Sequence, residues 1–293
     1  MTLATPKLDI YLLKSIDETA NSEDKYVDYL LESKLMMINE TKLVNVLEFK
    51  FINLADFQKN LNRFFNNKNN EEISYSCLIV TSRQVVEAMK LIDLKIEIDE
   101  TMGKMEFLIY CVGEQTRIQL KSFLLSKFPM FEKYFDIRIP SVRQNANELA
   151  NLIVMENRGP CRAFYPCSSI RKDDLIMKLK EARLEVDELK LYETIASKTA
   201  TNYLLKCLNE KNRFFTFPLI NCFVLFSPSC VQSAFECDEL REKLTNDSNY
   251  FITIGPSTSS KLKAFHHNFV EMNEPSPKCL VDTLGIVYSK IIN

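Results

Sequence analysis

Short apolar runs alternate with amphipathic helical stretches along most of this 293-residue chain. After Thr81, for example, apolar side chains recur at helical spacing from Val85 to Ile92. Strands that alternate with helices are typical of βαβ units, in which the strands join one parallel sheet. The sequence therefore predicts an α/β fold with mostly parallel sheets. The expected strands are Leu8–Lys14, Ser76–Thr81, Glu106–Val112, Arg162–Pro166, Asn221–Phe226 and Tyr250–Ile254.

The order of the turn motifs occurs twice along the chain. The stretch IVTSRQVVEA (residues 79–88) resembles LFSPSCVQSA (225–234), and YCVGEQTRIQL (110–120) resembles ITIGPSTSSKL (252–262). In both halves, a strand with a hydroxyl turn precedes a strand with a glycine turn, and each turn leads into a helical pattern. This repetition predicts two α/β domains of related design.

One of the two domains is expected to be discontinuous. The first strand and its helix, from Leu8 to about Lys34, have no partner strands nearby and are expected to complete the sheet of the C-terminal half. Two runs that alternate apolar and polar residues, NVLEFKF and DELKLYET, are expected to cross between the domains as a two-stranded ladder. The predicted parts are a discontinuous domain of residues 1–45 and 195–293, an inserted domain of residues 52–186, and linker strands at 46–51 and 187–194.

The composition limits the classes of partner. The formal net charge is -2 at pH 7, so no overall charge attracts nucleic acid or an anionic membrane surface. No apolar stretch is long enough to span a membrane, and the start MTLATPKLDI lacks the pattern of a signal peptide. We therefore expect a cytoplasmic protein that binds neither nucleic acid nor membrane.

The content of histidine, cysteine and glycine disfavours several kinds of catalytic site. The two histidines, His266 and His267, are adjacent and are expected as a surface pair late in a helix, so a His-rich metal site or a Ser-His-Asp triad has little support. The nine cysteines form no C-x-x-C motif and are expected as reduced core thiols. Only five glycines occur, without a G-x-G-x-x-G or P-loop pattern, which leaves dinucleotide and ATP binding unsupported.

Hydroxyl side chains are concentrated where the predicted strands meet the following helices. In open α/β sheets, ligands bind at the carboxyl ends of the strands, where helix N-termini expose N–H groups that favour carboxylates and phosphates. Helix capping is the simpler explanation for any single turn. Five such turns together predict a site for a ligand with several carboxylates. The turns contain Thr81 and Ser82, Gly113 and Thr116, Ser168 and Ser169, Ser227 and Ser229, and Ser257 and Thr258.

Taken in order, these motifs resemble the uroporphyrinogen-III synthase family. The motifs follow one another between Ile10 and Leu284, nearly the full chain. The most specific part is the ordered set PCSSIRKDDL, LYET, FSPS and IGPSTSSKL. The complete set is IVTSRQVVEA, YCVGEQT, NANELANLI, FYPCSSIRKDDL, LKLYET, LFSPSCV, ITIGPSTSSKL and EPSPKCLVDTL.

This resemblance implies two HemD-like parallel-sheet domains of the flavodoxin or Rossmann kind, joined by a two-stranded β ladder, with the active site in the interdomain cleft. It implies an enzyme of haem biosynthesis that closes hydroxymethylbilane to uroporphyrinogen III and inverts ring D through a spirocyclic pyrrolenine. The family uses no metal and no cofactor in this reaction. The implied partners are hydroxymethylbilane as substrate and, transiently, hydroxymethylbilane synthase, and we expect a monomer.

The resemblance also assigns roles to the candidate site residues. Tyr192 of LYET matches the family tyrosine proposed to assist departure of the substrate hydroxyl, and a phenol with a pKa near ~10 is a suitable proton donor. The alternative is that Tyr192 packs the ladder. The residues that match positions lining the cleft are Thr116, Ser227, Ser257 and Thr258. On the same reasoning, substrate binding is expected of Thr81, Ser82, Gly113, Ser168 and Ser229.

The fold alone leaves a second class of function open. A non-catalytic, two-lobed protein that binds a polycarboxylate such as a tetrapyrrole would have the same fold and the same hydroxyl turns. A nucleotide-dependent enzyme on a flavodoxin-like fold is disfavoured by the missing glycine loops. Tyr192 and the ordered set of motifs favour the synthase.

Overall fold

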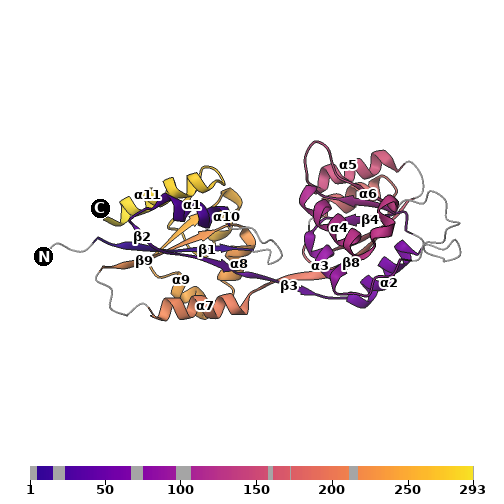
Figure 1. The fold of residues 1–293 in the computed structure, drawn as a ribbon. Helices are drawn as coiled ribbons and strands as arrows, with labels where there is room; N and C mark the ends of the chain where they lie inside the picture. Colours follow the sequence, from indigo (N-terminus) through magenta and orange to yellow (C-terminus); the bar gives the residue numbers. More distant parts are fainter. Residues whose placement is uncertain are drawn as a thin grey trace. The chain divides into compact units, whose positions relative to one another are not determined.

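The computed structural model describes residues 5–15, 24–66, 75–96, 107–157, 161–171, 173–210 and 217–292. It divides into two compact units, the first formed by Met1–Glu48 with Ile195–Asn293 and the second by Phe49–Thr194. Each unit contains one sheet with helices on both of its faces (Figure 1). The prediction of an α/β fold with mostly parallel sheets is confirmed.

The first unit contains a five-stranded sheet in the order β11-β10-β9-β1-β2. Every neighbouring pair in this sheet is parallel. The N-terminal strand β1 lies between β9 and β2 in this sheet. The strands are β1 (Lys7–Lys14), β2 (Ile38–Asn45), β9 (Leu219–Leu225), β10 (Asn249–Thr253) and β11 (Phe269–Glu271).

Helices cover both faces of this sheet (Figure 1). Ile10 and Leu12 of β1 pack in one hydrophobic cluster with α1 (Lys25–Ser33) and α11 (Pro277–Ile292). Tyr11 and Leu13 point to the opposite face because side chains alternate along a strand. All four of these β1 side chains are fully buried. The helices of that second face are α7 (Lys198–Asn209), α8 (Pro228–Ala234), α9 (Asp238–Leu244) and α10 (Pro256–Leu262).

The second unit contains a six-stranded sheet in the order β3-β8-β7-β4-β5-β6. The pairs from β8 to β6 are parallel. The remaining pair is β3 with β8. The Ile52 N–H donates to the Leu191 carbonyl, and the Ser197 N–H donates to the Val46 carbonyl. From Val46 to Ile52, the residue numbers of the partners fall from 197 to 191. The strands β3 and β8 therefore run antiparallel. The strands are β3 (Leu47–Phe51), β4 (Cys77–Val80), β5 (Phe107–Cys111), β6 (Phe135–Arg138), β7 (Arg162–Ser168) and β8 (Glu185–Ala196).

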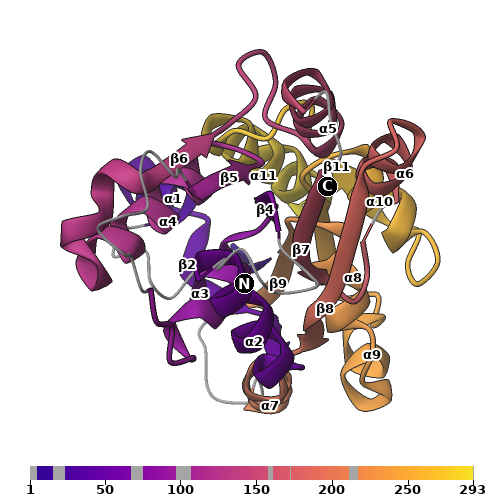
Figure 2. The same cartoon turned by 90° about the vertical axis from the view of Figure 1, so that its right-hand side faces the viewer.

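The helices of the second unit also form two layers (Figure 2). Leu78 and Val80 of β4 pack with one layer, formed by α2 (Leu54–Phe65), α3 (Arg83–Lys90) and α4 (Glu114–Lys127). Cys77 and Ile79 pack with the other layer. That layer consists of α5 (Ala146–Glu156) and α6 (Asp174–Glu181), and the 3-10 helix η1 (Pro129–Tyr134) follows α4.

The sequence pattern does not predict β2, β6 and β11. All three are edge strands of their sheet, so among the described residues each has a partner strand on one side alone. Their side chains are correspondingly less buried, and the four residues of β6 and the first two of β11 are half-buried. An edge strand therefore lacks the continuous apolar run by which the central strands are recognised.

The prediction of a surface histidine pair late in a helix is wrong. His266 follows the end of α10, and its ring lies 4.8 Å from the ring of Phe251 in β10. Burial lowers the pKa of His266 below the ordinary value of an imidazole. His267 is exposed, so the two neighbouring side chains lie in different environments.

Replacing Leu12 by alanine should lower the free energy of unfolding by about 2–5 kcal/mol, because it opens a cavity in a fully buried central strand. Urea denaturation followed by circular dichroism measures this loss. The control is Leu31→Ala on α1, where the side chain is 66% exposed and the expected change is within about 0.5 kcal/mol. Equal losses in the two variants would contradict the assignment of β1 to the core.

Candidate functional site

The candidate site residues of the second unit lie along one edge of its sheet. Thr81 follows β4, Gly113 comes two residues after β5, Ser168 ends β7, and Tyr192 lies in β8. These four strands run parallel, and each lies beside another in the order β8-β7-β4-β5. Their carboxyl ends therefore meet at the edge where open α/β sheets bind ligands.

Tyr192 contacts residues of several neighbouring elements at the carboxyl end of the sheet. The neighbouring Ser82 hydroxyl lowers the pKa of its phenol, and its carbonyl oxygen accepts the Ser169 N–H at 2.9 Å. Its ring meets that of Phe49 edge to face, with 6.0 Å between the ring centroids. The side chain is 7% exposed. Tyr192 thus packs beside β3, as one of the two sequence interpretations proposes, while its hydroxyl has a polar neighbour.

A β-bulge lies directly beside Tyr192. Cys167 of β7 pairs with Lys190, but the next residue, Ser168, pairs with Tyr192. Leu191 is therefore the extra residue of β8. A bulge bends the strand and redirects the side chains that follow, and bulges are common next to active sites. This irregularity places Tyr192 opposite Ser168, the last residue of β7.

The environment of Tyr192 keeps its phenol protonated. Burial raises the pKa of Tyr192 above the ordinary phenol value, and the hydrogen bond with Ser82 offsets part of that increase. A phenol with a raised pKa is neutral near pH 7 and holds a proton that it can donate.

Tyr165 is a second buried phenol at this edge, and no sequence pattern marks it as a site residue. Its hydroxyl lies 3.2 Å from the hydroxyl of Thr81, and its side chain is 5% exposed. Burial raises the pKa of Tyr165, and the hydrogen bond with Thr81 lowers it in part. In the sequence, Tyr165 is one aromatic residue of an apolar strand, so the pattern does not separate it from the core.

The N-terminus of α4 is already occupied by a side chain of the same unit. Gly113 is the N-cap residue and makes no side-chain cap bond. Instead, the Glu114 N–H donates to Oε1 of Gln144 at 3.0 Å. A Cβ atom at Gly113 would lie 2.5 Å from that oxygen, so the glycine makes room for Gln144. Thr116, in the first turn of α4, is 5% exposed and belongs to the interior.

In the first unit, Ser227 and Ser229 lie at the start of α8. The Ser227 hydroxyl accepts the Cys230 N–H at 3.1 Å and so caps the helix, which is the simpler of the two sequence interpretations for this residue. Ser227 is half-buried, whereas Ser229 is exposed. Ser229 therefore has a side chain free to meet solvent or a ligand.

The hydroxyl run of α10 divides into exposed and buried members. Ser257 is exposed, whereas Thr258 and Ser259 are 1% and 3% exposed. The hydroxyls of Ser259 and Thr253 lie 2.7 Å apart, which joins the helix to the end of β10. Gly255 precedes the helix and offers no side-chain cap. Part of this run is therefore structural.

Lys14 adds a positive charge at the carboxyl end of β1, and no sequence pattern marks it as a site residue. Its Nζ atom lies 2.5 Å from a carboxylate oxygen of Asp24 and 4.9 Å from the ring centroid of Phe226. Phe226 donates its N–H to the Leu13 carbonyl, so Lys14 lies next to the turn that leads into α8. A lysine at the end of an apolar run is common on protein surfaces, so its position in the sequence does not indicate a binding site.

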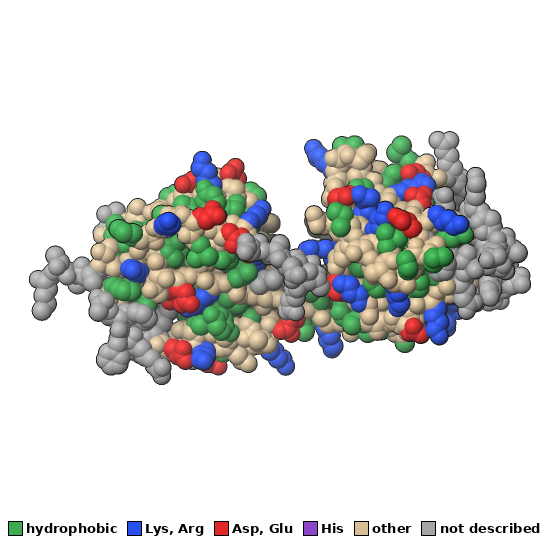
Figure 3. Space-filling view, viewed as in Figure 1, with side chains coloured by type: hydrophobic (Ala, Val, Ile, Leu, Met, Phe, Trp, Pro, Cys, Tyr) green, Lys and Arg blue, Asp and Glu red, His purple; other side chains and the backbone are tan. Residues whose placement is uncertain are grey.

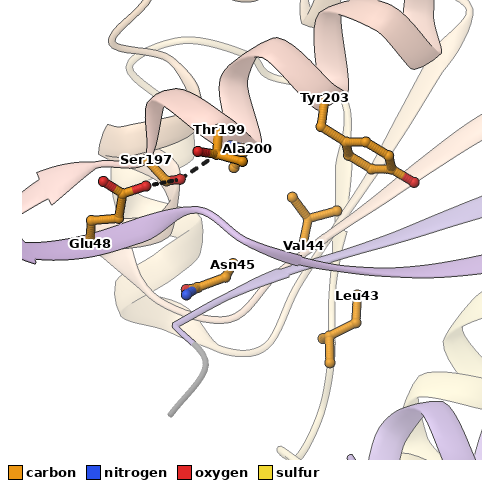
Figure 4. Close-up of a pocket in the computed structure, with 8 residues that line it drawn as sticks. All are labelled: Leu43, Val44, Asn45, Glu48, Ser197, Thr199, Ala200 and Tyr203. Atoms are coloured by element: carbon orange, nitrogen blue, oxygen red, sulfur yellow. Dashed lines mark hydrogen bonds between the residues drawn. The ribbon is translucent and has the colours of Figure 1, made fainter. Parts of the chain in front are cut away.

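A separate cavity of about 390 Å³ lies in the first unit between the end of β2 and the start of α7 (Figure 4). At one end, the Ser197 hydroxyl donates to Glu48 at 2.5 Å and accepts the Ala200 N–H at 3.1 Å. None of the candidate site residues lines it. The lining residues are Leu43, Val44, Asn45, Glu48, Ser197, Thr199, Ala200 and Tyr203.

Other classes of site have no support in the described part of the chain. Across those residues, no group of three or more His, Cys, Asp or Glu side chains is placed to hold a metal ion. Among the described helices, none is long and apolar enough to cross a membrane. On the face that Figure 3 shows, basic and acidic side chains are interspersed over both units, in keeping with the formal net charge of -2.

A solved structure shares the fold of this chain, and a second one matches less closely. The crystal structure of uroporphyrinogen-III synthetase from Helicobacter pylori 26695 matches with a TM-score of 0.51 and 14% identity, over 95% of this chain and 99% of that chain. A mutant uroporphyrinogen III synthase from the extremely thermophilic bacterium Thermus thermophilus has a TM-score of 0.48 and 14% identity, over 96% and 99%. A comparison with curated proteins found no match. The first of these structures shows the fold class, a pair of HemD-like α/β units.

The family follows from the sequence itself. The family model for uroporphyrinogen-III synthase HemD matches residues 40–282, most of the chain. The chain belongs to the uroporphyrinogen-III synthase family. The resemblance predicted from the ordered motifs is thereby confirmed.

Replacing Ser82 by alanine should raise the pKa of Tyr192 further, because the Ser82 hydrogen bond lowers that pKa in the native protein. NMR of ring-labelled tyrosine over a pH titration measures the change. The variant should also lose about 1 kcal/mol of stability, since Ser82 caps α3 through the Gln84 N–H. The control, Ser227→Ala, removes the cap of α8 and should leave the pKa of Tyr192 unchanged. An unaltered Tyr192 titration in Ser82→Ala would refute the contact.

Replacing Gly113 by alanine should displace Gln144 from the N-terminus of α4, because the new Cβ would clash with its side chain. The backbone at Gly113 is extended, so alanine meets no backbone strain there. We expect a loss of about 1 kcal/mol in urea denaturation and faster hydrogen exchange at the Glu114 amide. Gly255→Ala is the matched control, because nothing lies within 4 Å of its Cβ position. A similar effect of both substitutions would contradict the proposed contact.

Proposed function

We propose that this chain closes hydroxymethylbilane to uroporphyrinogen III with inversion of ring D, a step of haem biosynthesis. The observation that carries the proposal is the match of the uroporphyrinogen-III synthase family to residues 40–282. The fold supports it, since the chain has the same two-sheet architecture as a solved synthetase. A buried, protonated tyrosine at the carboxyl edge of the second sheet supports it as well.

The proposed reaction begins with loss of the terminal hydroxyl of hydroxymethylbilane, which leaves an azafulvenium cation. Hydroxide is a poor leaving group, so a proton donor accelerates this step. We assign the donor role to Tyr192, because its phenol is neutral near pH 7 and hydrogen-bonds with Ser82. The same hydrogen bond stabilises the phenolate that remains after proton transfer.

The substrate itself supplies the electrons for the later steps. Ring D is attacked at its substituted carbon to give the spirocyclic pyrrolenine, which then fragments and closes again at the free carbon. The task of the protein is therefore to hold a long, flexible chain in one folded conformation. Uncatalysed closure gives isomer I, so the protein has to stabilise the transition state that leads to isomer III.

We propose that hydroxyls at the carboxyl edges of the two sheets bind the eight carboxylates of the substrate. Ser229 and Ser257 are exposed and free to donate to a carboxylate. Thr116 and Thr258 are buried, so we assign them to shaping the first turns of α4 and α10. Gly113 has the same supporting role. The half-buried hydroxyls that complete the set are Thr81, Ser82, Ser168 and Ser227.

The chemistry of the substrate suggests the setting in which the protein works. Hydroxymethylbilane closes without a catalyst to isomer I, so rapid transfer from the enzyme that makes it is advantageous. We therefore propose a transient contact with hydroxymethylbilane synthase. We also propose that the protein acts as a cytoplasmic monomer and that residues 46–51 and 187–194 are the linker strands.

Analysis of porphyrin isomers tests the proposed function. Hydroxymethylbilane is generated in place with its synthase, this protein is added, and the oxidised products are separated by chromatography. Mostly isomer III is expected. Isomer I alone, from protein shown to be folded, would exclude the synthase and favour a non-catalytic polycarboxylate-binding protein.

Replacing Tyr192 by phenylalanine should lower kcat by about 100-fold or more, because it removes the proton donor and retains the ring that packs against Phe49. Isomer I should increase as spontaneous closure overtakes the enzyme. The control is Tyr29→Phe, which changes a tyrosine on α1 that is 39% exposed. Full activity of Tyr192→Phe would leave Tyr192 with a packing role alone.

A further inference from the structure

Two cysteine side chains meet inside the second unit. The sulfur atoms of Cys77 and Cys161 are 3.9 Å apart, although the residues are 84 positions apart in the sequence. Cys77 begins β4, and Cys161 immediately precedes the neighbouring strand β7. Ser76 donates its N–H to the Arg162 carbonyl at 2.8 Å, which fixes the two chain segments against each other. All nine cysteines of the chain are free thiols in this structure.

The two thiols differ in access and in charge. Cys77 is fully buried, whereas Cys161 is 6% exposed. The hydrogen bond from Cys77 lowers the pKa of Cys161, burial opposes this, and the Ser76 hydroxyl lowers it further. The hydrogen bond with Cys161 and burial both raise the pKa of Cys77. The lowered pKa favours the thiolate form at Cys161, and the raised pKa favours the protonated thiol at Cys77.

We propose that Cys77 and Cys161 are a modification site, a dithiol that hydrogen peroxide converts reversibly to a disulfide. In the first step, the Cys161 thiolate attacks one peroxide oxygen, the O–O bond breaks, and with one proton the products are a Cys161 sulfenic acid and water. In the second step, the Cys77 sulfur attacks the sulfenic sulfur, and its proton leaves with the hydroxyl as a second water. The two thiols lose two electrons in total, which reduce one peroxide molecule.

The position of the pair predicts the consequence of oxidation. Cys77 and Cys161 lie at the amino ends of β4 and β7, whereas Thr81 and Ser168 lie at the carboxyl ends of the same strands. The disulfide would join two central strands and close a loop that contains α3, β5, α4, β6 and α5. A crosslink over such a long loop restricts the unfolded chain. Oxidation should therefore stabilise the second unit and leave the carboxyl edge with Tyr192 unchanged.

Peptide mapping of the full chain tests the proposal. The reduced protein is treated with hydrogen peroxide, remaining thiols are alkylated, and the tryptic digest is analysed by mass spectrometry. We expect tryptic peptides 69–83 and 159–162 joined by a disulfide, with a mass lower by about 2 Da than the two thiol peptides, and separation by dithiothreitol. The midpoint of thermal unfolding should rise by roughly 5 °C or more.

Variants separate the attacking thiol from the resolving thiol. In Cys77→Ala, Cys161 should continue to the sulfinic acid, a gain of about 32 Da, because no thiol resolves the sulfenic acid. In Cys161→Ala, Cys77 should stay reduced. Cys222→Ala is the control, since Cys222 is fully buried in the first unit and should not alter the crosslink. Wild-type protein in which both thiols stay reduced, or in which Cys161 gains oxygen without the crosslink, would overturn the proposal.

Discussion

The parallel pairing of β1 with β9 and β2 is the interaction on which the arrangement of the whole chain depends. β1 begins at Lys7, whereas β9 begins at Leu219, so the first sheet is complete only after the second unit has been inserted between them. Four successive side chains, Ile10 to Leu13, are fully buried and alternate between two helical layers. The chain must leave this sheet and return to it. The two boundaries between the units, after Glu48 and after Thr194, fall within the neighbouring strands β3 and β8.

One irregularity in β8 has the largest consequence for chemistry. Because Leu191 is an extra residue in the pairing with β7, Tyr192 pairs with Ser168. Burial then raises the pKa of this phenol and keeps the proton in place. The proposed reaction needs few reactive groups, since the substrate supplies its own nucleophile. Tyr165 and Tyr192 are both buried phenols with a raised pKa at this end of the sheet, and the proposed reaction uses the proton of Tyr192.

The sequence predicts where the hydroxyl turns lie, but it does not predict whether each hydroxyl side chain caps a helix, packs in the interior or stays exposed. A strand followed by a hydroxyl and a helical pattern already places the hydroxyl at the carboxyl edge of a parallel sheet. Whether it caps a helix, like Ser227, lies in the interior, like Thr258, or stays exposed, like Ser257, depends on packing from other elements. Tyr165 was missed for the same reason, because its contact with Thr81 joins two different strands.

The sequence by itself determined the α/β class, the central strands and the family, because these depend on local periodicity and on the order of motifs. The sequence did not predict the edge strands β2, β6 and β11, because a half-buried strand lacks a continuous run of apolar residues. Tertiary structure alone decided the bulge at Leu191, the cap that Gln144 provides and the meeting of Cys77 with Cys161. Each of these requires an exact register between segments distant in the sequence, and no local pattern encodes that register.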